Sequence, residues 1–206
     1  MNAPAPILAW YFSTADKRLR YDDNRAIALG VTHEVTGDIA LCERGLHASI
    51  KPLDAIEYAP GPIVWRVELS GSVLTGDDKL CATRRTYIAG GVDATDLLRK
   101  FARQCALDVA HLWDMPEVVR RYLETGDESL SAAARDAASD AAWAAASDAA
   151  RAAARAAAWA AARVAAWAAA RDAAWAAARA AARDAAWAAQ NTRLEAMLLE
   201  VVWGGK

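Results

Sequence analysis

The sequence is short of the residues that mark several classes of protein. It has three cysteines in 206 residues, too few and too scattered for a disulfide framework, so we expect a cytoplasmic protein. The N-terminus, Met1–Pro6, has no basic segment followed by an apolar run and predicts no signal peptide. No uncharged run reaches the ~18 apolar residues of a membrane-spanning helix, so we expect no membrane association.

The chain also has no large excess of positive or negative charge. The net charge is −2, and residues 131–190 carry seven arginines against five aspartates. This small excess disfavours nucleic acid as a partner, since such binding depends on a concentrated basic surface. Arg84 and Arg85, beside Lys79, are expected on a solvated face of mixed charge.

Glycine and proline are absent from Asp127 to Trp203, and alanine takes their place. Alanine supplies 55 residues of the chain, of which 38 lie in residues 131–190. This tract repeats every four residues. Serine, arginine or tryptophan stands first, alanine or aspartate second with one valine, and alanine in the other positions until Gln190. Because alanine is the best helix former, the tract predicts helix throughout.

The four-residue period limits how these helices can pack. An α-helix turns ~100° per residue, so each repeat overshoots a full turn by ~40° and the tryptophans spread around the helix. Without a constant apolar stripe, a parallel coiled coil and an amphipathic helix on a membrane are both disfavoured. One long helix and several antiparallel helices remain open. We favour burial of the tryptophans, by folding back or by self-association.

The first 92 residues have the pattern of a small domain of strands and turns. Ile63–Leu69 alternates as a strand does, and Leu80–Ile88 is its expected antiparallel partner. Helical spacing begins after Asp93, and a second helix is expected from Pro116 until Gly126 ends it. The predicted fold class is α+β, with a mixed head (1–92), two connecting helices (93–126) and an alanine-rich helical module (127–206).

The end of the module regains an ordinary amphipathic pattern. Apolar residues recur at helical spacing from Leu194 to Val202, and this stripe needs a groove from the head or from a second subunit. Tryptophan and arginine also dominate binding hot spots, which favours an interaction role. The candidate interface residues are Trp143, Trp159, Trp167, Trp175, Trp187, Leu194, Leu198 and Val202.

Residues that could carry chemistry are few and poorly spaced. Cys42 and His47, and Cys105 and His111, do not have zinc-motif spacing, and the second pair points to different sides of a helix, so no metal is expected. No motif marks a cofactor site or a catalytic centre. An enzyme in the head is the alternative, and its candidate residues are His47, Tyr58, Glu68 and Arg84.

Four stretches of the head carry a resemblance. They read Leu41-Cys-Glu-Arg-Gly-Leu-His-Ala-Ser, Asp54-Ala-Ile-Glu-Tyr-Ala-Pro-Gly, Trp65-Arg-Val-Glu-Leu-Ser-Gly and Asp78-Lys-Leu-Cys-Ala-Thr-Arg-Arg. In this order they resemble a family of uncharacterised phage and prophage proteins, over roughly residues 6–92. The continuation from His111 into the alanine-rich helices resembles chains labelled immunity proteins. The resemblance implies a mobile-element accessory protein that acts by binding, and it carries over no functional residue.

We therefore predict a non-enzymatic phage-type accessory protein that acts on a protein partner, or assembles with itself, through the Ala/Trp/Arg module. A small transferase-like enzyme in the head, with the repeat as an oligomerisation device, is the alternative. A repeat expansion with little function is the third hypothesis.

Overall fold

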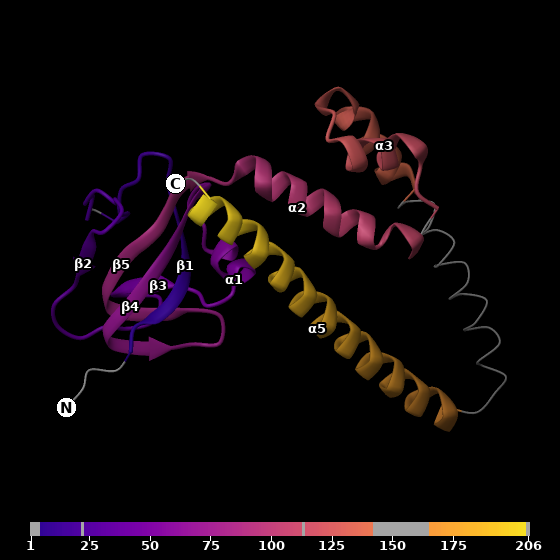
Figure 1. Cartoon of the computed structure of the whole chain (residues 1–206). Coiled ribbons are helices and arrows are strands. Elements are labelled where there is room, and N and C mark those ends of the chain that lie inside the picture. The colour runs from indigo at the N-terminus through magenta and orange to yellow at the C-terminus, as the bar shows by residue number, and fades with distance from the viewer. Residues whose placement is uncertain (1–4, 22, 113, 142–164, 205–206) are drawn as a thin grey trace. The chain divides into compact units, whose positions relative to one another are not determined.

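The structure is a computed structural model that describes residues 5–21, 23–112, 114–141 and 165–204 (Figure 1). Within these ranges, the side chains of residues 112 and 165–182 are left undescribed. The chain divides into two units. The first unit joins residues 1–98 to residues 188–206, and the second consists of residues 99–187.

A five-stranded antiparallel sheet is the centre of the first unit (Figure 1). Its strands are β1 (Ile7–Ser13), β2 (Thr32–Glu34), β3 (Leu46–Ala48), β4 (Ile63–Thr75) and β5 (Leu80–Asp93). β4 and β5 form a long hairpin, β1 pairs with β4, and β2 and β3 pair with different parts of β5. The predicted strand and its predicted antiparallel partner are confirmed as parts of this hairpin.

The main core lies on one face of the sheet. Trp65, Val67 and Leu69 alternate along β4 toward this face and pack with Tyr87 of β5, as the two-residue period of a strand requires. Leu46 of β3 belongs to the same buried cluster.

The other face of the sheet holds the end of helix α5 (Ala165–Gly204), near the short helix α1 (Pro52–Glu57). The side chains of Leu194 and Leu198 are fully buried there. The Glu195 carboxylate accepts a hydrogen bond from the indole of Trp10. The amphipathic stripe therefore packs within the same unit as the sheet, and the head supplies the groove that the stripe needs.

Every regular element that the structure describes in the second unit is a helix, and short irregular segments join these helices. It contains most of α2 (Thr95–Asp108), the short helix η1 (Ala110–Leu112), α3 (Glu117–Thr125), the short helix η2 (Glu128–Leu130) and a helical stretch over residues 131–141. Gly126 ends α3 with φ of 70°, as predicted, and the Asp127 side chain accepts from the Ser129 N–H to start η2.

The chain is thus a mixed α+β protein with an antiparallel sheet and several helices. Residues 142–164 lie outside the described part of the chain, so the choice between one long helix and antiparallel helices stays a prediction. Among the described residues, no helix is long and apolar enough to cross a membrane.

Truncating the buried stripe should destabilise the first unit. Because Leu198 is fully buried, Leu198→Ala should lower the free energy of unfolding by about 2–5 kcal/mol, measured by urea denaturation with tryptophan fluorescence. The matched control is Leu29→Ala at a leucine that is 60% exposed, with an expected change within about 0.5 kcal/mol. Equal effects of the two substitutions would show that the α5 stripe adds nothing to stability.

Candidate functional site

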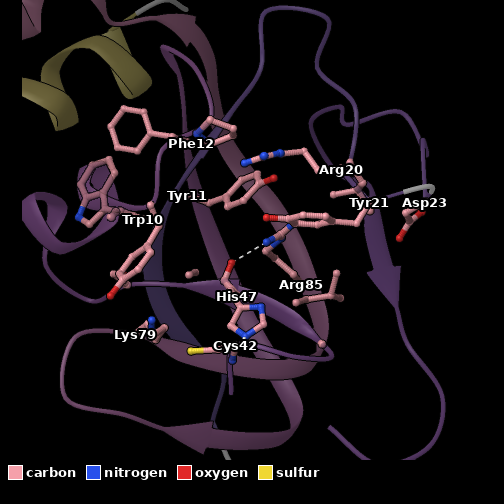
Figure 2. Close-up of a pocket in the computed structure, with 18 of the residues that line it drawn as sticks. Trp10, Tyr11, Phe12, Arg20, Tyr21, Asp23, Cys42, His47, Lys79 and Arg85 are labelled. Carbon is pink, nitrogen blue, oxygen red and sulfur yellow. Dashed lines mark hydrogen bonds between the residues drawn. The ribbon is translucent and has the colours of Figure 1, made fainter. Parts of the chain in front are cut away.

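A pocket of about 630 Å³ lies in the first unit beside β1, β3 and the start of β5 (Figure 2). Its walls come from β1, β3, the end of α1 and the loops around them. The lining includes Trp10, Tyr11, Cys42, His47, Tyr58, Lys79 and Arg85.

The buried side chain of Arg85 is the central feature of this pocket. It is 2% exposed and faces the main core, because β5 pairs it with Leu69. Its Nε and Nη2 donate to the Tyr87 hydroxyl at 3.0 and 2.7 Å, and Nη1 donates to the His47 carbonyl at 2.6 Å (Figure 2). A guanidinium has five N–H groups, so two stay available after these bonds.

The charge of Arg85 has no carboxylate beside it among the described residues. Its partners are a hydroxyl, a carbonyl and the ring of Tyr11, whose centre lies 3.7 Å from Cζ. Two acids line the pocket among the described residues: Asp23 is held by Arg25 at 2.5 and 2.7 Å, and Glu43 is exposed. A buried cation is costly unless hydrogen bonds or an opposite charge offset its removal from water, and the printed partners of Arg85 are all uncharged groups.

A chain of hydrogen bonds behind Arg85 keeps its neighbours neutral. The Tyr87 hydroxyl accepts from Arg85, so its own proton is directed to His33 Nδ1 at 3.1 Å. His33 Nε2 then donates to the Ala26 carbonyl at 3.1 Å. Burial, with Arg25 and Arg85 nearby, lowers the pKa of His33, and burial raises the pKa of Tyr87 to about 12. The site therefore stays cationic near neutral pH.

The other end of the pocket gathers His47, Cys42 and Lys79 (Figure 2). His47 Nε2 accepts from the Cys42 N–H at 3.1 Å, and burial beside Arg85 and Lys79 lowers the pKa of this imidazole. The contact with Tyr58 raises the pKa of Lys79, whose Nζ lies 3.8 Å from the centre of the Tyr58 ring and 4.0 Å from Asp78 Oδ1. His47 is thus neutral near pH 7, and Lys79 is a second cation that has Asp78 as its counter-charge.

A tight turn before β3 shapes this end. Cys42 has φ of 67°, and Gly45 has φ of 132° with its α-carbon close to Cys81. A Cβ at Gly45 would overlap Cys81 Sγ, so the turn requires glycine there. The turn brings the Cys42 backbone N–H to His47, which is five residues further on.

The structure separates the residues proposed for an enzyme. His47 and Tyr58 line the pocket, whereas Glu68 and Arg84 lie outside it. Arg84 is exposed and forms an ion pair with Glu34 at 2.9 Å. The expectation of a solvated Arg84-Arg85 pair is correct for Arg84 and wrong for Arg85, because strand alternation turns the second arginine inward. Arg85 and Tyr87 are two residues apart and so lie on the same face of the strand, and this spacing could have indicated that Arg85 is buried.

The predicted interface residues fall into three groups. Leu194, Leu198 and Val202 are buried in the first unit, and Trp187 is 44% exposed. Trp143 and Trp159 lie outside the described residues, as do the side chains of Trp167 and Trp175. Among the described residues, no group of three or more His, Cys, Asp or Glu side chains could hold a metal ion.

A family model described as a domain of unknown function (DUF7666) matches residues 14–100. The match includes His47, Tyr58, Lys79 and Arg85 but leaves out β1 and α5. No curated protein and no solved structure matches the chain. The chain thus contains a domain similar to this family, and its own geometry is the guide to function.

The buried His33 and the half-buried His47 should make the fold sensitive to acid. Their folded-state pKa values lie below 6.5, so the unfolded chain takes up more protons as the pH falls below 6.5. Their contribution to stability is complete above pH 6.5 and is lost as the pH falls through the folded-state values. Urea denaturation from pH 7.5 to 5.5 measures the loss, and NMR titration of the imidazole protons gives each pKa. A His33 or His47 that titrates above 6.5 in the folded protein would contradict the assignment.

Proposed function

We propose that the head domain binds a small anionic molecule in the pocket beside Arg85. The observation that carries this proposal is a buried guanidinium with two available N–H groups and no carboxylate partner among the described residues. Its planar fork suits the two oxygens of a carboxylate or a phosphate. The guanidinium is already fixed by Tyr87 and His47, so a ligand does not have to order it.

The rest of the pocket indicates what accompanies the anionic group. Its volume of about 630 Å³ falls within the range of ordinary small-molecule sites. Tyr11 and Tyr58 provide aromatic wall, and Lys79, which pairs with Asp78 at 4.0 Å, provides a second positive charge. The ligand class is therefore an oxyanion, carboxylate or phosphate, attached to an apolar or planar group.

Removal of Arg85 should abolish most of this binding. Loss of a charge-assisted hydrogen bond costs about 1.5–3 kcal/mol, so Arg85→Gln should weaken binding roughly 10- to 100-fold. The probes are inorganic phosphate and benzoate, added to the full chain and followed by calorimetry and by the NMR signal of Arg85 Nε–H. The adjacent Arg84→Gln is the matched control and should bind within about twofold of the wild type.

Two results would contradict the proposal. One is a wild-type protein whose Arg85 Nε–H signal responds to neither probe. The other is an equal loss of affinity in Arg84→Gln and Arg85→Gln, which would indicate a general effect of surface charge.

We also propose interaction with a protein partner or self-assembly through the Ala/Trp/Arg module. The observation that favours it is that residues 99–187, which hold most of the repeat, form a unit separate from the one that contains the sheet. Trp187, at the edge of that segment, is 44% exposed. Tryptophans at such positions are typical of interface hot spots.

Light scattering coupled to size exclusion tests self-assembly. A truncated chain is unsuitable, because it would lose the buried Leu194 and Leu198. We therefore compare the full chain with a variant that carries alanine at Trp143, Trp159, Trp167, Trp175 and Trp187. The wild type should have a multiple of the 22.0 kDa chain mass, and the variant a single chain mass. Trp203→Ala is the control and should assemble normally. A monomeric wild type, or a variant that still assembles, would count against self-assembly.

A further inference from the structure

The end of α5 contacts the wall of the anion pocket at two points. Glu195 Oε1 accepts from Trp10 Nε1 at 3.4 Å, and Trp10 itself lines the pocket. Asn191 Oδ1 accepts from the backbone N–H of Leu53 at 3.1 Å. Leu53 belongs to α1, which is followed by the lining residue Tyr58. Two elements of the pocket wall are therefore held by a helix that does not itself line the pocket.

The contact at Trp10 is part of a partly exposed charged cluster, in which 12% of the Arg66 side chain and 40% of the Glu195 side chain are exposed. The guanidinium of Arg66 lies 4.5 Å from the centre of the Trp10 ring, and its Nη2 is 3.8 Å from Glu195 Oε1. Arg66 Nη1 is buried without a hydrogen-bond partner among the described residues. The Glu195 carboxylate thus contacts both the indole of Trp10 and the guanidinium of Arg66, so undocking of α5 would leave Arg66 without this counter-charge.

A short series of contacts joins this cluster to Arg85. The backbone of Trp10 exchanges two hydrogen bonds with Ser49, at 2.7 and 3.0 Å. Ser49 directly follows β3, where the His47 carbonyl accepts from Arg85 Nη1 at 2.6 Å. The position of Trp10 and the geometry of the anion site therefore depend on the same backbone segment.

We infer that docking of the α5 end, residues 188–204, and anion binding at Arg85 are thermodynamically linked. Docked α5 holds Trp10 and α1 in the arrangement that the ligand binds, and a bound anion in turn stabilises the docked helix. Linkage requires the two effects to be equal in size. The inference rests on the proposed anion site. Since α5 continues without a break from Ala165, the linkage makes the helical module sensitive to the ligand.

Substitutions in α5, outside the pocket, test the linkage. Glu195→Gln in the full chain should weaken the binding of inorganic phosphate and benzoate about tenfold, a typical coupling. Asn191→Ala, which removes the contact with α1, should act in the same direction and replaces Glu195→Gln if that variant does not fold. Glu200→Gln, on an exposed face of the same helix, is the matched control and should leave both affinities within about twofold.

The reciprocal effect is measured by hydrogen exchange. Saturating phosphate should slow exchange of the backbone amides of residues 194–202 about tenfold in the wild type and leave it unchanged in Arg85→Gln. Suppose that binding is lost in Arg85→Gln but that affinity is unchanged in Glu195→Gln and in Asn191→Ala. This result would overturn the linkage and leave the proposed function intact. Absence of binding to the wild type would overturn both.

Discussion

The buried guanidinium of Arg85 is the constraint on which the head domain depends. Its removal from water is offset by the Tyr87 hydroxyl, the His47 carbonyl and the ring of Tyr11, none of which carries a charge. Tyr87 can accept from Arg85 only if its own proton is directed to His33, and His33 must then be neutral. One cation thus fixes the protonation of two further side chains. Arginine is suited to this position, since its planar guanidinium can donate to the Tyr87 hydroxyl and to the His47 carbonyl at the same time.

Strand β1 connects this cation to the opposite side of the sheet. Neighbouring residues of a strand point to opposite faces, so Tyr11 lies against Arg85 while Trp10 lies against Arg66 and Glu195. The pairing of β1 with β4 therefore sets both contacts at once. A shift of the β1–β4 register by one residue would exchange the faces on which Trp10 and Tyr11 lie. Both the hydrogen bond from the Trp10 indole to Glu195 and the contact of the Tyr11 ring with the Arg85 guanidinium would then be lost. This shared register is the physical basis for a connection between the pocket and the C-terminal helix.

The sequence predicts those parts of the fold that depend on residues close together along the chain. The strand at Ile63–Leu69, the end of α3 at Gly126 and the cap at Asp127 follow from alternation, backbone freedom and a short polar side chain. The burial of Arg85 could not be predicted in this way. Arg84 and Arg85 differ only in which face of β5 they occupy, and the cover on that face comes from Tyr11, more than 70 residues away in sequence. Likewise, the stripe from Leu194 to Val202 predicts a groove but not which part of the chain provides it.

The boundary between the two units coincides with a change of period in the sequence. Up to Trp187 the chain follows the four-residue repeat, whose first position rotates around a helix by ~40° at each step. A helix of this kind presents no lasting apolar face to a flat partner such as a sheet. From Asn191 onward the spacing returns to that of an ordinary amphipathic helix, and within a few residues Leu194 is fully buried. The first unit resumes at Ala188, at the end of the repeat. The period of the sequence, rather than its helical propensity, therefore decides which part of α5 joins the head, since alanine would favour helix on both sides of the boundary.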